Sequence, residues 1–386
     1  MNLRSLIHGK LHLPAWARRL ISSLACLCAL IFLVGISNAQ EKEEFDLGND
    51  TKRIVLSPWE SVDIGSDASF RGLHVVDDKV IWVSGTKGSV LVSSDGGKTW
   101  RDRSVEGAEE LDFRDIHAFD DGTAIIISSG DVARIFRTTN GGRTWNSCGS
   151  KSNAFFDAIS FWDDRYGIVM SDPIDGRVWL ARTKDGGKSW KSLKTANLPA
   201  AEAGEAGFAA SGTNMCVVGE NTCFIGLGGT EENQTRKNSR ILISKDRGMT
   251  WSYGGPIPIQ RSPSAGIFSV WFADEKTGVA VGGDYLNADD TTSNYAVTRD
   301  GGRTWTTPSP RVPPNGFRSC VTSWKKGREV RLVAVGTNGT DMSTDMGDKW
   351  VRISKKGFNS VDFSDTGRSG WAVGGDGSVA RWVLPK

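Results

Sequence analysis

Three arginines occupy matching places in the chain, because Arg71, Arg114 and Arg318 each follow a phenylalanine directly. A guanidinium group presents a planar fork of N–H donors that fits a carboxylate or a phosphate. If the fold brings the three side chains together, they would hold an anionic ligand. The alternative is that they pair with acids of this chain, such as Asp115 and Asp157, and join neighbouring structural units.

Further candidates for ligand binding lie in segments that are rich in polar and acidic residues. They are Asp172, Asp175, Arg177, Glu205, Ser264, Asp284 and Tyr285. The acids of 284–290 are of the type that binds calcium, but their spacing is not that of a defined calcium loop, and solvated carboxylates are the alternative. We therefore predict no metal site and assign no catalytic residue.

The common catalytic signatures are missing from the sequence. There is no G-x-S-x-G elbow, no H-E-x-x-H pair and no phosphate loop. The glycines of 226–229 do not form a dinucleotide fingerprint, and no helical pattern follows them. The only histidines beyond residue 39 are His74 and His117. These observations predict that the protein has no cofactor.

Cys216 and Cys223 flank a segment that reads as strand, tight turn and strand. A cross-strand disulfide between them is one interpretation, provided that the protein is in an oxidising compartment. Two buried thiols are the other.

A short motif recurs six times and indicates the fold that positions these side chains. Copies such as SSDGGKTW (93–100) and TRDGGRTW (298–305) follow one another at spacings of 45 to 61 residues. A catalytic motif has no reason to occur six times, whereas a structural turn does. A period of this length is typical of a propeller or a solenoid. The acidic or amide positions and the tryptophans of the motif are Asp95, Asn140, Asp185, Asp246, Asp300 and Asp345, with Trp100, Trp145, Trp190, Trp251, Trp305 and Trp350.

The chemistry of the motif suits a tight turn between the third and fourth strands of a repeat. Its Asp can accept hydrogen bonds from backbone N–H groups, and its glycines can adopt positive φ without a steric penalty. The tryptophan would bury a large face against neighbouring strands.

Each repeat otherwise reads as short apolar strands that are separated by polar turns. Seven strand openings can be counted, at Phe70, Phe113, Phe156, Phe208, Ile267, Phe317 and Phe358. The seventh repeat lacks the motif, and the strand-like residues 52–64 have no repeat of their own. We predict an all-β, seven-bladed β-propeller of four-stranded antiparallel blades over residues 52–386. Its N-terminal strand would complete the last blade and so protect the sheet edges.

The first 39 residues have the pattern of a signal peptide. Four basic residues precede an apolar run, and small residues end the segment at Ala39. We expect cleavage near Ala39, a short linker over 40–51 and a secreted or periplasmic protein; an uncleaved anchor is the alternative. After cleavage no stretch could span a membrane. The remaining 43 Lys and Arg against 45 Asp and Glu argue against nucleic-acid binding. We expect a monomer.

Long connections interrupt the repeat at six places. In an up-and-down blade, connections between the second and third strands fall on the same face as connections between blades. The elaborated loops should therefore converge on one mouth of the ring, where a rigid scaffold usually places its binding residues. These connections are 171–177, 193–207, 226–240, 254–266, 282–295 and 306–316.

The motif S/T-x-D-G-G-x-T/S-W resembles the Asp-box, or BNR repeat, of sialidase-like propellers. Sialidases bind a sugar carboxylate with three arginines and use a tyrosine as nucleophile, so the resemblance implies a role for Arg71, Arg114 and Arg318. Tyr285 would be the nucleophile, although this chain lacks a full match to the family's early Phe-Arg-Ile-Pro segment.

The boxes and short strands such as 279–283 and 371–375 also resemble the photosystem II assembly and stability factor family. That resemblance implies an exported, seven-bladed propeller without enzymatic activity that holds a partner protein on one face through arginines. We therefore expect a non-enzymatic propeller that binds a protein segment or an anionic glycan on its loop-rich face. The alternative is a sialidase-like glycoside hydrolase.

Overall fold

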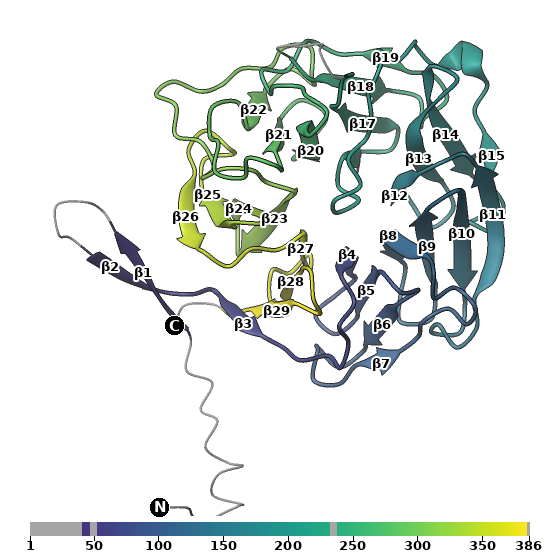
Figure 1. Cartoon of the computed structure of the whole chain (residues 1–386), viewed down its shortest axis with the longest axis horizontal. Coiled ribbons are helices and arrows are strands. Elements are labelled where there is room, and N and C mark those ends of the chain that lie inside the picture. Colours follow the sequence, from purple (N-terminus) through teal and green to yellow (C-terminus); the bar gives the residue numbers. More distant parts are fainter. Residues whose placement is uncertain (1–40, 47–51, 232–237, 384–386) are drawn as a thin grey trace, which may run out of the picture. The chain divides into compact units, whose positions relative to one another are not determined.

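The computed structural model describes residues 41–46, 52–231 and 238–383. Seven antiparallel sheets follow one another around a ring, and each begins with the strand nearest the centre (Figure 1). The predicted seven-bladed propeller is therefore confirmed. Residues 1–40, which hold the predicted signal peptide, lie outside the described part.

The first three blades each have four strands in chain order. Blade 1 consists of β4 (Phe70–Val75), β5 (Ile81–Gly85), β6 (Val90–Ser93) and β7 (Arg101–Asp102). Blade 2 consists of β8 (Asp112–Ala118), β9 (Ala124–Ser129), β10 (Val132–Thr138) and β11 (Asn146–Ser152). Blade 3 consists of β12 (Phe156–Phe161), β13 (Gly167–Ile174), β14 (Arg177–Thr183) and β15 (Lys191–Ser192).

The next three blades repeat this order, with one strand fewer in blade 5. A 3-10 turn, η1 (Thr195–Asn197), precedes blade 4. Blade 4 consists of β16 (Met215–Val218), β17 (Thr222–Leu227), β18 (Arg240–Ser244) and β19 (Ser252–Tyr253). Blade 5 consists of β20 (Ala265–Phe272), β21 (Gly278–Asp284) and β22 (Tyr295–Thr298), with an isolated bridge from Val297 to Thr306 at the place of a fourth strand. Blade 6 consists of β23 (Cys320–Lys326), β24 (Glu329–Gly336), β25 (Gly339–Ser343) and β26 (Val351–Ser354).

Blade 7 joins the two ends of the propeller. Its first three strands are β27 (Ser360–Phe363), β28 (Gly370–Val373) and β29 (Val379–Trp382), and its fourth is β3 (Trp59–Ser61) from the N-terminal side. Trp59 pairs with Trp382 in this ladder. The N-terminal strand thus closes the ring as predicted. Within the predicted segment 52–64 the strand covers 59–61, and the flanking Pro58 and Val62 also hydrogen bond to this blade, whereas β2 (Lys52–Leu56) pairs with β1 (Lys42–Asp46).

The core consists of the interfaces between successive blades. In β9 every residue is buried, since both faces of the sheet are covered. Ile126 packs in the same cluster as Trp82 of blade 1, whereas Ile125 and Ile127 pack in the cluster of Phe156 of blade 3. Such continuous apolar runs are what a strand with two covered faces requires. The ring therefore behaves as one rigid support for the loops at its mouths.

Each Asp-box forms the predicted turn between the third and fourth strands. In the first copy Asp95 accepts hydrogen bonds from the backbone N–H of Thr99 (2.9 Å) and from its hydroxyl group (2.6 Å). The Thr99 hydroxyl is the main cause that lowers the pKa of Asp95 to about 2. Gly96 and Gly97 have φ of 76° and 79°, where a side chain would be strained. These contacts give the box a structural role.

Cys216 and Cys223 are free thiols in the structure. Val217, not Cys216, lies opposite Cys223 in the ladder between β16 and β17. Because neighbouring residues of a strand point to opposite faces, the two thiols face different blade interfaces. Cys223 belongs to the core cluster of Met170 and Cys216 contacts that of Phe272. The structure therefore contains two separate thiols and no disulfide between Cys216 and Cys223.

Candidate functional site

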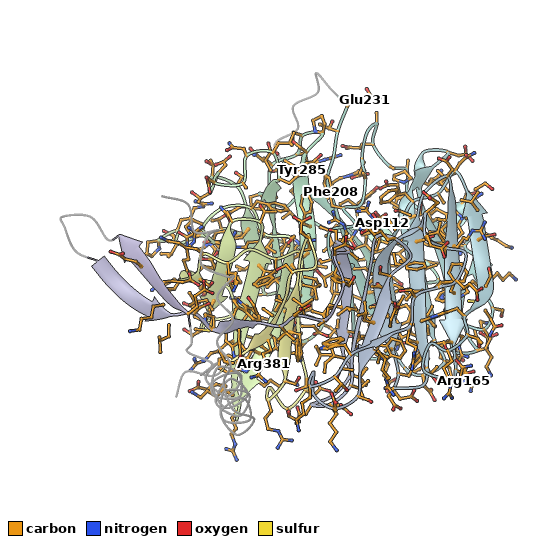
Figure 2. The ribbon with its side chains drawn as sticks, turned by 60° about the horizontal axis from the view of Figure 1, so that its bottom comes forward. Asp112, Arg165, Phe208, Glu231, Tyr285 and Arg381 are labelled. Carbon is orange, nitrogen blue, oxygen red and sulfur yellow. The ribbon has the colours of Figure 1, made fainter. Side chains whose placement is uncertain are left out.

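A cavity of about 520 Å³ opens at the loop-rich mouth of the ring. All seven blades or the connections that lead into them contribute to its wall. Figure 2 shows Asp112, Phe208 and Tyr285 at this end of the ring, whereas Arg165 and Arg381 lie at the other end. The side chains that matter for its chemistry are Arg71, Arg114, Asp172, Phe155, Phe208, Phe268, Phe317 and Tyr285.

β-bulges place several of these side chains. The register shifts after Phe70, Phe113, Phe156 and Ile267, so that the extra residues of β4, β8, β12 and β20 are Arg71, Arg114, Asp157 and Phe268. A bulge bends the strand and redirects the side chain of the unpaired residue. The bulged position is therefore repeated around the ring, and the type of side chain that it holds differs from blade to blade.

Arg71 and Arg114 supply the positive charge of the cavity. Arg114 is tied to Asp112 at 2.9 Å, and its guanidinium lies 5.0 Å from the ring centre of Phe155. The Nε atom of Arg71 is buried and has no hydrogen-bond partner among the described residues. Burial and the nearby charge of Arg114 lower the pKa of Arg71, and Asp112 opposes this shift. An incoming carboxylate would give Arg71 the acceptor that it lacks.

Arg318 does not join the other two arginines, which corrects the expected cluster of three. Its side chain is completely buried. The Nε atom donates to Asp341 at 2.6 Å, Nη2 is also paired with that carboxylate, and Nη1 donates to Asn338 at 2.7 Å. Arg318 therefore forms an internal ion pair, which was the alternative interpretation. Its partner is Asp341 and not Asp115 or Asp157.

Two carboxyl groups lie side by side beneath Gly207. Asp172 accepts the backbone N–H of Gly207 at 2.8 Å, and a Cβ on this glycine would meet Asp157 Oδ2 at 2.8 Å. Asp157 is fully buried, and neither of its oxygens has a hydrogen-bond partner in the described part. Burial, reinforced by the charge of Asp172, raises the pKa of Asp157 well above its usual value. Burial likewise raises the pKa of Asp172 to about 6.

An aromatic cluster forms the apolar side of the cavity. Phe268 stacks on Phe208 with ring centroids 4.1 Å apart and meets Phe317 edge-on at 4.6 Å. Tyr285 contacts the same ring at 6.2 Å and is 46% exposed, and the neighbouring Leu286 is 76% exposed. Exposed apolar groups beside an apolar cavity are typical of a binding surface.

The remaining candidates do not line the cavity. Asp175 is exposed at the turn between β13 and β14, and Arg177 donates to the Leu198 carbonyl. Glu205 is buried in ion pairs with Arg240 and Arg261. Two further candidates serve local turns: Ser264 contacts Ser262, and Asp284 accepts the Leu286 N–H.

Deeper in the ring, His74 and His117 lie together, with ring centres 4.7 Å apart. His74 accepts the backbone N–H of Ala118 through Nδ1 at 2.9 Å and so joins blade 1 to blade 2. Burial lowers the pKa of His74 to about 4 and that of His117 well below its usual value. Both rings are thus neutral groups that hold blades together.

Sequence reasoning named Tyr285 but missed the phenylalanines of the site. Phe208 was expected to open blade 4, but that blade begins at Met215, and Phe208 lies in the preceding connection. Phe155 and Phe317 likewise lie outside the strands. Phe268 could have been found, because it occupies the same position after an opening apolar residue as Arg71 and Arg114.

The described residues contain neither a metal-binding cluster nor a membrane-spanning helix. No group of three or more His, Cys, Asp or Glu side chains is arranged to hold a metal ion there. Among the same residues there is no helix with the length and apolar character needed to cross a membrane.

Comparison with known proteins agrees with this architecture. Residues 51–152 match the family model described as photosynthesis system II assembly factor YCF48. The chain is 24% identical over 383 residues to the photosystem II stability/assembly factor HCF136, chloroplastic, of Arabidopsis thaliana, covering 94% of this chain and 85% of that protein. It is 24% identical over 182 residues to the photosystem II assembly lipoprotein Ycf48 of Synechococcus sp. (strain CC9902).

The match to the Synechococcus protein covers 46% of this chain and half of that relative. The chain spans half or less of the length of each cyanobacterial relative that it matches. A solved structure described as YCF48 bound to D1 peptide superposes with a TM-score of 0.58 at 18% identity, covering 85% of this chain and 96% of that one. The chain is therefore an Asp-box propeller that resembles the photosystem II assembly factors, and the structural likeness concerns the fold.

Proposed function

We propose that this protein is a non-enzymatic propeller that binds a polypeptide segment at the loop-rich mouth of its ring, in an assembly or scaffold role. The observation that carries the proposal is the cavity that combines Arg71 and Arg114 with five aromatic side chains. One wall offers unsatisfied donors for an anion, and the other offers apolar surface.

The charge of the cavity favours a carboxylate. Among the described residues its wall contains one acid, Asp172, against the two arginines, and burial raises the pKa of Asp172 to about 6, so that it is neutral below that pH. A peptide carboxylate can accept two hydrogen bonds from one guanidinium fork. Arg71 is the better partner, because Arg114 is already paired with Asp112.

The aromatic cluster favours a peptide over a sugar. Phe208, Phe268 and Tyr285 present apolar surface on which side chains of a bound segment would pack. A relative of the same fold is described as bound to a D1 peptide, which supports a peptide ligand for this chain. An anionic glycan would use the arginines but would leave most of the aromatic surface unused.

A sialidase-like hydrolase is less well supported. That activity would need three arginines around the sugar carboxylate, and Arg318 is held by Asp341 away from the cavity. The Asp157 and Asp172 pair lies partly behind the wall, with Asp157 fully buried. We therefore propose binding without catalysis.

The test is calorimetric binding of a synthetic peptide that ends in apolar residues and a free carboxylate, compared with the same peptide amidated. Arg71→Gln should weaken binding of the acid by about 1.5–3 kcal/mol, roughly tenfold to hundredfold, as expected for a charge-assisted hydrogen bond. It should barely change binding of the amide. Arg165→Gln, at the opposite end of the ring, is the matched control (Figure 2).

Two results would contradict the proposal. One is that the unaltered protein binds the acid and the amide peptide with equal affinity, and that Arg71→Gln binds both as tightly as the unaltered protein does. The other is hydrolysis of a fluorogenic sialoside that disappears in Tyr285→Phe, which would move the hydrolase ahead.

We propose further that the chain is exported and acts as a monomer after cleavage near Ala39. The curated relatives are described as a lipoprotein and as chloroplastic, which supports a location reached through an N-terminal targeting segment. N-terminal sequencing of the exported protein should begin near Gln40. An intact N-terminus in the membrane fraction would support the uncleaved anchor instead.

A further inference from the structure

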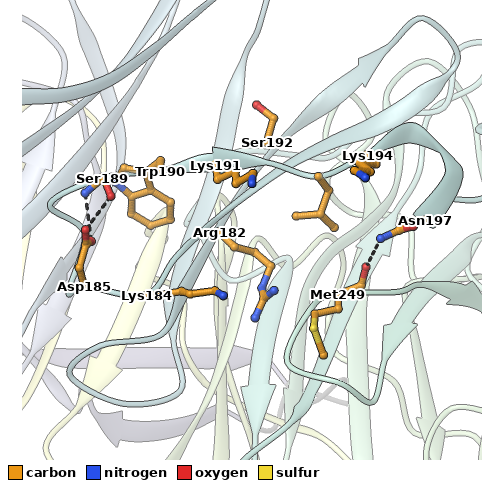
Figure 3. A pocket seen from close by; sticks show the side chains of 11 residues that line it. Arg182, Lys184, Asp185, Ser189, Trp190, Lys191, Ser192, Lys194, Asn197 and Met249 are labelled. Atoms are coloured by element: carbon orange, nitrogen blue, oxygen red, sulfur yellow. Dashed lines mark hydrogen bonds between the residues drawn. The ribbon is translucent and has the colours of Figure 1, made fainter.

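A second pocket lies on the outside of the ring, between the Asp-box turns of blades 3 and 4 (Figure 3). Its volume is about 460 Å³. The guanidinium of Arg182 points into its centre, and Met249 and Asn197 form the opposite side. Asn197 donates from Nδ2 to the Met249 carbonyl at 2.9 Å, which joins η1 to the box of blade 4. This pocket is separate from the cavity at the mouth.

Arg182 differs from its counterpart one blade earlier. Arg137 and Arg182 both precede the threonine that begins an Asp-box. Arg137 donates from Nε to the carbonyl of Gly186, in the box of the next blade, at 2.8 Å. The Nε atom of Arg182 is buried and has no such partner within the described residues. The arginine Nε–H therefore links blade 2 to blade 3, whereas the equivalent Nε–H between blades 3 and 4 has no acceptor among the described residues.

The box of blade 4 also differs in sequence from the box of blade 3. Arg247 stands where the other box has Gly186, and it adopts a φ of 59°. Its own side chain turns away, because Nε donates to the Glu220 carbonyl at 2.8 Å and the guanidinium lies 4.5 Å from the ring centre of Tyr166. Burial lowers the pKa of Arg182 and the nearby charge of Asp246 opposes this shift, while its Nε atom keeps no hydrogen-bond partner among the described residues.

The charge of the pocket is strongly positive. Lys184, Lys191 and Lys194 line it with Arg182, and none of the three lysines is paired with a carboxylate in the part of the chain that the structure describes. The single acid of the lining, Asp185, is occupied by the backbone N–H and hydroxyl group of Ser189 at 3.0 and 2.6 Å. The chain without residues 1–39 is slightly acidic, so this charge is local.

The pocket also has the features that bind a polypeptide backbone. Lys191 and Ser192 form β15, the outermost strand of blade 3, whose outer edge has no partner strand among those described. An exposed edge can pair with an extended segment through main-chain hydrogen bonds. Leu193 and Met249 add apolar surface, and Met249 is 49% exposed.

We propose that this groove between blades 3 and 4 binds an acidic polypeptide segment. A carboxylate of the segment accepts from the open Nε–H of Arg182, the lysines balance further acids, and apolar side chains lie against Leu193 and Met249. The protein would then hold two polypeptide segments, or two parts of one partner, at different places on the ring.

The test is fluorescence anisotropy with a short labelled peptide of alternating Glu and Leu, beside the same peptide with Gln in place of Glu. The double variant Lys191→Gln/Lys194→Gln and the single variant Arg182→Gln should each weaken binding of the acidic peptide by about tenfold or more. The Gln peptide should bind weakly to every form. Lys98→Gln/Lys349→Gln is the matched control, because it removes the same charge from exposed lysines of other boxes.

Three outcomes would overturn the proposal. Equal losses in the two double variants would show diffuse attraction of charge, which salt screens. Loss in Arg71→Gln, with the groove variants unaffected, would place the peptide at the mouth. Binding to phosphatidylglycerol vesicles that requires Lys191 and Lys194, without peptide binding, would identify the groove as a lipid headgroup site.

Discussion

The ring of Phe208 stacks on the ring of Phe268, with centroids 4.1 Å apart and planes inclined by 15°. Phe208 comes from the connection between blades 3 and 4, and Phe268 is the bulged residue of β20 in blade 5. The contact fixes the connection over the mouth of the ring and creates the apolar half of the cavity.

Phe208→Ala should weaken binding of the apolar carboxylate peptide while the fold is retained. Phe208 is half-buried at the mouth and belongs to no strand, so its removal takes contact area from the ligand more than from the core. We expect a loss of about 1.5–3 kcal/mol in binding free energy. Calorimetry measures the affinity, and circular dichroism confirms the fold. Unchanged affinity would exclude the aromatic cluster from the binding site.

Arg318→Gln should destabilise the protein strongly, in contrast to Arg71→Gln. Arg318 and Asp341 are both completely buried, so removing one charge leaves the other unpaired in the interior. The expected loss is about 3–5 kcal/mol in the free energy of unfolding. Urea denaturation measures it. Arg331→Gln breaks the exposed pair with Glu329 and should cost no more than about 1 kcal/mol. Equal stability of Arg318→Gln and Arg331→Gln would contradict the internal role of Arg318.

Binding of a carboxylate peptide should become weaker as the pH rises through about 6. Burial raises the pKa of Asp172 to about 6, so its carboxyl group is neutral below that pH and repels an anion above it. A peptide carboxyl group has an ordinary pKa of about 3.3–3.7 and stays charged throughout. Affinity measured between about pH 5 and pH 8 should fall for the unaltered protein. The profile of Asp172→Asn should be flatter, and an identical profile would assign the effect to another group.

Trp350→Ala should show that the box tryptophans belong to the fold. Trp350 is 2% exposed and packs with Val321 and Leu332 between blades 5 and 6. Truncation of a buried tryptophan costs about 3–5 kcal/mol. Thermal unfolding measures the loss, and peptide affinity of the folded fraction should not change. A near-neutral effect on stability would contradict the packing role of the box.

The stability of the protein should not depend on a disulfide between Cys216 and Cys223. Their side chains face opposite sides of the sheet, so no rotation about χ1 brings the sulfur atoms together. Unfolding midpoints with and without a reducing agent should agree, and alkylation of the unfolded, unreduced protein should label both thiols. Mass spectrometry that finds the two cysteines linked would overturn the register between β16 and β17.

Much of the architecture could be predicted because its signals are local. The Asp-box holds its turn through atoms within a few residues, as the bonds from Thr99 to Asp95 show. Its recurrence therefore marks six of the seven blades and their order. The strand that closes blade 7 was also predictable, since Trp59–Ser61 lies within the unrepeated segment 52–64 and the last repeat lacks an outer strand.

The roles of individual site residues depended on contacts that are distant in the sequence. Arg71 and Arg318 occupy the same position of their blades, yet Asp341 of β25 holds Arg318 in the interior, while Arg71 faces the cavity. Arg137 and Arg182 likewise occupy one repeat position, yet only the Nε atom of Arg137 donates to a carbonyl in the box of the next blade within the described residues. The sequence by itself determined the repeated turns and the candidate face, because both follow from short-range chemistry. The tertiary structure decided which charged groups remain free, because a charge is satisfied by whichever residue the packing of blades brings next to it.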